Sequence, residues 1–144
     1  MPAATPVPEG RVLGLDLGDV RTGVAISDAD RRLALPFGNV KAGAPQDLKA
    51  IVEIVRENDV TEVVVGHPLS LSGKPGPRAR MAEEFAEALG STLDIPVHLH
   101  DERLSTVEAN RALKEAGASN RRSRGAVDAS AASVVLQAWL DLTR

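Results

Sequence analysis

Hydrophobic residues along this chain follow two spacings, which predict strands alternating with helices. Short runs rich in Val, Ile and Leu are typical of strands, whereas Leu48, Ile51 and Val55 recur three or four residues apart, as on one face of a helix. The patterns predict strands at residues 11–17, 22–27, 33–40, 62–66 and 95–100. They predict helices from 46 to 58, from 78 to 90, from 105 to 117 and from 126 to 142.

The order of these elements indicates an α/β fold built on one mixed sheet. Gly18, Asp19 and Val20 are a connection of hairpin length between the first two strands. The run at 62–66 is continuously apolar, as in a strand covered on both faces. We expect a five-stranded mixed sheet, its first three strands antiparallel, with helices on both faces. In the second helix, Met81, Phe85 and Leu89 are expected to form the buried stripe.

Composition indicates one globular domain at residues 11–144 behind a flexible tail at residues 1–10. The chain has 144 residues and no Cys, which excludes a disulfide scaffold and a Cys nucleophile and fits a cytoplasmic protein. No segment has the apolar length of a membrane helix, so no membrane partner is expected. The net charge is −3, but basic residues gather at 74–80 and 103–124, which predicts two positive segments.

Three acidic positions carry the candidate chemistry. Asp16 lies in an otherwise apolar strand, where an unpaired carboxylate is costly, so either the turn amides of Gly18 and Asp19 satisfy it or it meets a cation. Asp128 falls in the expected first turn of the last helix, where the helix dipole alone also explains an acid. Asp101 and Glu102 follow the fifth strand directly, and strand alternation lets only one of them face a given site.

Carboxylates at strand ends and a helix start form an all-oxygen cluster, which suits Mg²⁺ or Mn²⁺. A pair of such ions is an established means of hydrolysing phosphodiesters. A zinc site at His98 and His100 is the weaker alternative, because no third ligand lies at a recognised spacing. His67 is expected in a loop near the site.

Basic residues near these acids predict contacts to nucleic-acid phosphates. Arg21 follows the first turn and Arg103 adjoins Glu102, and a guanidinium binds phosphate oxygens in pairs. The basic run from Asn120 to Gly125 is expected to be a loop before the last helix. Three aromatic residues in the whole chain favour backbone and shape recognition over base stacking. The expected nucleic-acid-binding residues are Arg21, Lys74, Arg78, Arg103, Arg121, Arg122 and Arg124.

Four blocks resemble the YqgF (RuvX) family of bacterial nucleases. They are Asp16 to Gly23, Gly66 to Gly73, Asp101 to Thr106 and Asp128 to Ala132, in the family's order. His67 departs from the Leu or Phe that many members carry. The resemblance implies a ribonuclease H-like fold and a metal-dependent nuclease whose acidic triad is Asp16, Glu102 and Asp128, with Asp101 as the alternative to Glu102. It also implies a role in maturing the 5′ end of the small-subunit ribosomal RNA precursor, or Holliday junction cleavage like that of the RuvC resolvase.

Two further functions stay open. The Asp-x-Gly turn at Asp16 is also typical of actin-like phosphotransferases, although that fold needs two lobes and this chain supplies one. A noncatalytic RNA-binding assembly factor is the other alternative. We expect a monomer, with a dimer left open, because no self-complementary patch is recognisable.

Overall fold

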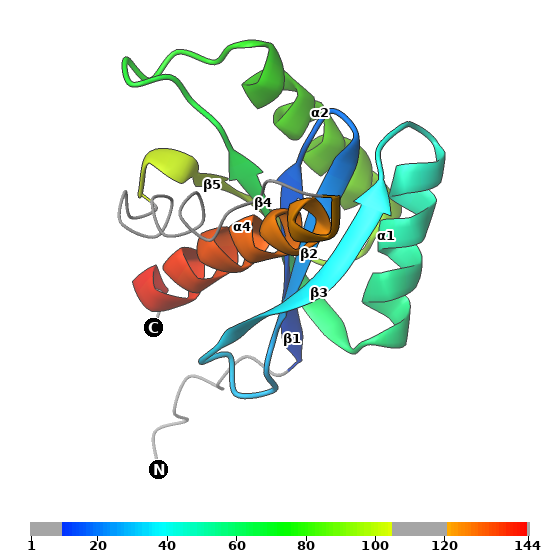
Figure 1. Ribbon diagram of the computed structural model, residues 1–144. Helices are drawn as coiled ribbons and strands as arrows, with labels where there is room; N and C mark the ends of the chain where they lie inside the picture. Colours follow the sequence, from blue (N-terminus) through cyan, green and yellow to red (C-terminus); the bar gives the residue numbers. More distant parts are fainter. Residues whose placement is uncertain (1–9, 105–120, 144) are drawn as a thin grey trace.

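Two helical layers enclose a central sheet (Figure 1). The computed structural model describes residues 10–104 and 121–143, and of residues 121–128 and 130 it describes only the backbone. Of the expected tail at 1–10, residues 1–9 lie outside the described residues, as does the expected helix at 105–117. None of the described helices is long and apolar enough to cross a membrane.

The elements follow the predicted order. The strands are β1 (Arg11–Leu17), β2 (Arg21–Ser27), β3 (Ala34–Lys41), β4 (Val60–His67) and β5 (Val97–Asp101). The helices are α1 (Gln46–Glu57), α2 (Pro77–Thr92) and α4 (Arg121–Leu142), with a short 3-10 helix, η1, at Glu102–Leu104.

The sheet has the order β3-β2-β1-β4-β5. β1, β2 and β3 pair antiparallel, while β4 pairs parallel with both β1 and β5. The expected mixed sheet with helices on both faces is therefore confirmed. Because β1, β4 and β5 run in the same direction, their carboxyl ends lie along one edge of the sheet, where ligands bind in open α/β folds.

Alternation along the strands separates two cores. Leu13 and Leu15 of β1 pack with α1 and α2, whereas Val12 packs with Leu136 of α4 on the other face. Gly14 faces α4 so closely that a Cβ added there would lie 2.7 Å from Leu136 Cβ. Gly14 thus lets α4 lie directly on the central strand.

α2 corrects the expected buried stripe. Its buried residues are Ala79, Ala82, Ala86 and Leu89. Of the expected stripe, Leu89 is confirmed as buried, whereas Met81 and Phe85 are half-buried. Phe85 packs against the core, and alanines occupy the other buried positions of the helix.

α4 begins earlier than expected. It starts at Arg121, so the basic run expected as a loop before the helix forms its first turns. Asp128 is consequently the eighth residue of the helix rather than a first-turn residue. The helix-dipole explanation of this acid does not apply, because the dipole effect falls off within the first turn.

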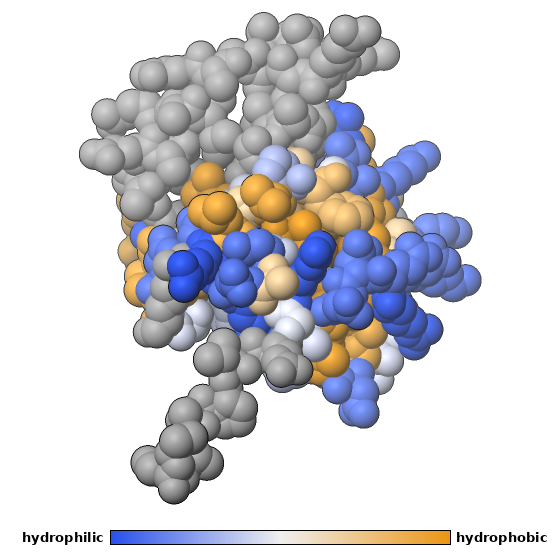
Figure 2. All heavy atoms as spheres, turned by 90° about the horizontal axis from the view of Figure 1, so that it is seen from below, coloured by the Kyte–Doolittle hydropathy of each residue, from blue (hydrophilic) through white to orange (hydrophobic). Residues whose placement is uncertain are grey.

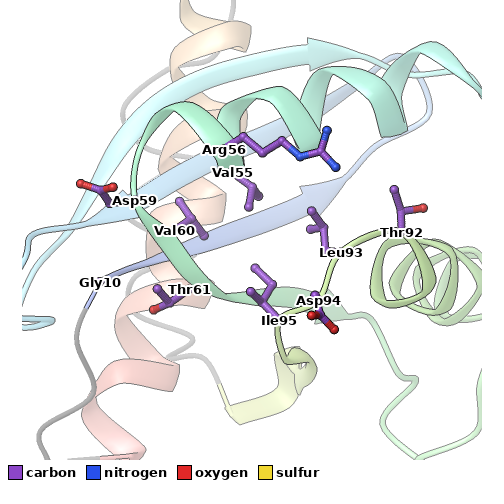
Figure 3. Close-up of a pocket in the computed structure, with 10 residues that line it drawn as sticks. All are labelled: Gly10, Val55, Arg56, Asp59, Val60, Thr61, Thr92, Leu93, Asp94 and Ile95. Carbon is purple, nitrogen blue, oxygen red and sulfur yellow. The ribbon is translucent and has the colours of Figure 1, made fainter.

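The end of the molecule where the chain enters β1 lies opposite the carboxyl ends of β1, β4 and β5. It carries a band of hydrophobic surface bordered by charged residues (Figure 2). A cavity of about 720 Å³ lies at this end, between the last turns of α1 and α2 and the starts of β1 and β4. Figure 3 shows apolar side chains of Val55, Val60, Leu93 and Ile95 along it, with Arg56 and Asp94 nearby. The cavity therefore lies away from the edge that carries the candidate acids.

Candidate active site

Asp16 lies on the α4 side of β1, at the carboxyl end of the strand. It follows Gly14 by two residues and so shares its face of the sheet. The Gly18 amide, expected as one possible partner of Asp16, instead donates to the Arg21 carbonyl at 3.0 Å and closes the β1–β2 turn.

Glu102 opens η1 directly beyond β5 and lies over Gly66 of β4. A Cβ at Gly66 would lie 2.8 Å from Glu102 Oε1 and 3.4 Å from Val135 Cγ2 of α4. The glycine therefore leaves the space that the carboxylate occupies between β4 and α4. This role of Gly66 was not predicted from the sequence, although the glycine at the end of an apolar strand was a usable signal.

Asp16 and Glu102 come together in this space. Burial and the neighbouring Asp16 carboxylate raise the pKa of Glu102 from its ordinary value of 4.5 to about 7. Both residues line a cavity of about 140 Å³, together with Gly66, Pro68 and Arg78. Two carboxylates confined in this way repel each other unless a cation or a proton lies between them.

Asp101 has a different environment. Arg103 donates from Nη2 to Asp101 Oδ2 at 2.6 Å and from Nε to Oδ1 at 3.0 Å. The Arg103 hydrogen bonds hold the pKa of Asp101 below its usual range. Of the two adjacent acids, the structure thus places Glu102 beside Asp16 and pairs Asp101 with an arginine.

The side chain of Asp128 is outside the described residues. Its backbone lies in α4, one helical turn before Ala132. The Ala132 carbonyl oxygen would lie 3.2 Å from a Cβ at Gly14, so this part of α4 crosses β1 near its carboxyl half.

The three histidines do not converge. His98 Nε2 lies 2.8 Å from Glu62 Oε2, and its ring lies 5.2 Å from the Trp139 ring. His67 Nε2 lies 3.8 Å from Glu83 Oε1. His100 is buried beside Gly66, and burial lowers its pKa. Among the described residues no three His, Asp or Glu side chains form a metal-holding group.

The basic residues divide into those near the acids and those elsewhere. Arg78, in the first turn of α2, lines the carboxylate cavity and favours the charged form of Glu102. Arg103 lies in η1, and its Nη1 is 3.5 Å from the Leu71 carbonyl oxygen in the loop before α2. Lys74 is exposed in that loop. Arg21 is half-buried at the start of β2. Arg121, Arg122 and Arg124 lie in α4 with their side chains outside the description.

Comparisons with known proteins agree with this arrangement. A family model described as "RuvX: Holliday junction resolvase" matches residues 10–142. A protein of Anaeromyxobacter dehalogenans (strain 2CP-C) named "Putative pre-16S rRNA nuclease" is 49% identical over 132 residues, covering 91% of this chain and 96% of the relative. A Chloroflexus aurantiacus (strain ATCC 29366 / DSM 635 / J-10-fl) protein of the same name is 43% identical, covering 92% and 88%.

Among solved structures, T. thermophilus RuvC in complex with a Holliday junction substrate matches with a TM-score of 0.58 at 14% identity. The match covers 93% of this chain and 96% of that chain. The mixed sheet therefore has the ribonuclease H-like fold. The chain belongs to the RuvX family. The identification made from the four motifs is confirmed, including membership of a family of nucleases.

Proposed function

We propose that this chain is a divalent-metal-dependent nuclease that hydrolyses phosphodiester bonds. The observation that carries the proposal is the confinement of Asp16 and Glu102 in one small cavity, where the pKa of Glu102 is raised to about 7. Such a pair gains its full charge at neutral pH when a cation lies between the carboxylates. Oxygen ligands of this kind fit Mg²⁺ or Mn²⁺.

Asp16, Glu102 and Asp128 are the proposed metal ligands and catalytic acids. When bound, two such ions supply an activated water and stabilise the leaving oxygen. The protein's own contribution is to hold the half-buried Asp16 and Glu102 carboxylates close together, with Glu102 over Gly66. Asp101, the alternative acid, instead orients Arg103 next to the site.

The arginines position the substrate. Arg78 lines the cavity and Arg103 lies beside it, so both guanidiniums are placed to hold phosphate oxygens of the strand being cut. Lys74 extends this positive surface along the loop. Arg21, Arg121, Arg122 and Arg124 are further proposed contacts to the backbone, and they predict a strong dependence of binding on salt.

The proposed substrate is structured RNA, and the proposed role is processing of the 5′ end of the small-subunit ribosomal RNA precursor. The names of the curated relatives support this choice. Holliday junction cleavage is the second candidate, supported by the family description. We propose a cytoplasmic monomer whose residues 11–144 form one nuclease domain, with a dimer as the alternative that junction cleavage favours.

A matched panel of substrates tests the proposal. The panel contains single-stranded RNA, single-stranded DNA, duplex and a four-way junction, each incubated with EDTA, Mg²⁺ or Mn²⁺. The proteins are the wild type, Asp16→Asn and Glu87→Gln, which removes an exposed acid outside the cavity as a control. We expect metal-dependent cutting that Asp16→Asn abolishes and Glu87→Gln retains. Binding without cutting in every metal would favour the noncatalytic RNA-binding alternative, and the preferred substrate separates RNA processing from junction cleavage.

A further inference from the structure

A groove between α1 and α2 adjoins the carboxylate cavity. It has a volume of about 520 Å³, and we call it the α1–α2 groove. Leu17, at the end of β1, lines both the groove and the cavity that holds Asp16 and Glu102. The β1–β2 turn lies beside α2 at this end of the sheet (Figure 1). The groove therefore lies next to the candidate active site.

The walls of the groove are apolar and come from separate elements. Met81 and Phe85 line it from α2, and Pro45 and Leu48 line it from the start of α1. Met81 and Phe85 are the residues expected as a buried stripe from sequence, yet the structure leaves them half-buried. Phe85 is one of three aromatic residues in the chain; it packs against the core on one side and also lines the groove.

The rim of the groove is acidic. Asp19, Asp47 and Glu84 line it, and the two carboxylate oxygens of Asp47 accept hydrogen bonds from the backbone amides of Gly43 and Leu48. Carboxylates repel phosphate, so the sugar-phosphate backbone is not the part that enters. Carboxylates do accept hydrogen bonds from the amino and imino groups of bases.

We propose that the α1–α2 groove binds an unstacked, amino-bearing nucleobase of the substrate, one nucleotide away from the scissile phosphate. Arg78 at the cavity and Phe85 in the groove are seven residues apart on α2, about 10 Å along the helix. Residues seven apart lie on the same face of a helix, so the phosphate lies near the first turn of α2 and the base about two turns further along that face. Guanine fits best, since its N1–H and exocyclic N2–H₂ donate side by side to one carboxylate.

This inference rests on the proposed nuclease function, because that function supplies the nucleic acid. It adds a preference for single-stranded segments, whose bases are free to leave the stack. It also adds a choice among bases at one position, which backbone recognition alone does not give.

Binding without cleavage tests the groove. The probes are fluorescein-labelled oligouridines that carry one guanosine, or one inosine, at successive positions; inosine lacks the exocyclic amino group. Fluorescence anisotropy is measured in an Asp16→Asn background, so that no probe is cut. We expect tighter binding of guanosine than of inosine by about 3- to 10-fold at one position.

Two variants and one control locate the effect. Phe85→Ala weakens binding of the guanosine probe by about 5- to 10-fold through lost stacking. Glu84→Gln removes a charged acceptor at an exposed position and abolishes the preference for guanosine over inosine. Glu87→Gln makes the same charge change on the same helix, outside the groove, and keeps that preference.

Each outcome decides the proposal. If Phe85→Ala does not fold, the guanosine-to-inosine ratio of Glu84→Gln decides alone. Equal binding of both probes by the parent protein, or an unchanged ratio in Glu84→Gln, overturns the groove as a base site. A wild-type chain that prefers guanosine but cuts no substrate would refute the nuclease and leave the groove supported, whereas cutting with no base preference would do the reverse.

Discussion

The substitution Glu102→Gln, which removes one charge from the Asp16–Glu102 pair, is expected to stabilise the metal-free protein. In the folded state the pKa of Glu102 is about 7, against an ordinary value of 4.5. Between these values the folded protein holds a proton that the unfolded chain has released, so stability falls as pH rises through this window. Below pH 4.5 the carboxyl group is neutral in both states and the penalty is absent.

The pKa difference sets the size of the effect. At about 1.4 kcal/mol per pKa unit, the full difference gives a ceiling of about 3.4 kcal/mol above pH 7. Glu102 is partly exposed, so water screens the repulsion and we expect about 1–2 kcal/mol. For a chain of this length that corresponds to a rise of about 3–8 °C in Tm at pH 8 for Glu102→Gln.

Thermal unfolding at pH 4.5 and pH 8 in EDTA measures this effect, with Glu87→Gln as the surface control. The gain of Glu102→Gln is expected at pH 8 and largely absent at pH 4.5. Mg²⁺ is expected to stabilise the wild type at pH 8 and to have less effect on Glu102→Gln, a readout independent of cleavage. A variant no more stable than the wild type at pH 8, or a gain of equal size at both pH values, would refute the reasoning.

Three further changes test the surroundings of the site. Gly66→Ala places a Cβ 2.8 Å from Glu102 Oε1, so the carboxylate must move; we expect at least about a 10-fold loss of cleavage, measured beside an unchanged circular dichroism spectrum. Gly14→Ala places a Cβ 2.7 Å from Leu136 Cβ, and we expect the free energy of unfolding in urea to fall by about 1–3 kcal/mol. Burial alone would raise the pKa of Glu62, but hydrogen bonds from an arginine and a histidine outweigh it and lower the pKa. Its stabilising contribution is therefore present above pH 4.5 and lost as pH falls below that value, and Glu62→Gln should flatten this part of the stability profile.

The strands were predictable because each carries its own local pattern. The apolar run in β4 and the three-residue turn after β1 identified a covered central strand and a hairpin, and both are confirmed. Hydrophobic periodicity did not locate the start of α4, since Arg121, Arg122 and Arg124 give its first turns no apolar face. Periodicity correctly placed Leu89 in the core, and Phe85 packs against it while half-buried. It did not predict that the other buried positions of α2 are alanines, because the distance between helix and sheet cannot be read from the sequence.

The pairing of Asp16 with Glu102 could not be predicted from the spacing of residues in the sequence alone. Strand alternation left Asp101 and Glu102 as alternatives, and what separates them is the register of β4 with β5. Gly66 lies opposite His100, and Glu102 follows two residues later, over the glycine. One residue of slip in that register would place a different acid there. A long-range pairing thus selects the acid, while local sequence supplies both candidates.

The two glycines and the alanine face of α2 have a common effect on the site. Gly14 admits α4 and Gly66 admits Glu102, so two half-buried acids lie close together at the end of the sheet. The alanines of α2 hold that helix close to the sheet and leave Met81 and Phe85 to line the groove beside them. Small residues therefore create both the electrostatic cost at the carboxylates and the apolar space next to them. Neither the repulsion between the carboxylates nor the apolar groove stabilises the fold, so we propose that both serve the substrate. In that proposal the cation-bound phosphate lies at Asp16 and Glu102, and the base lies at Phe85.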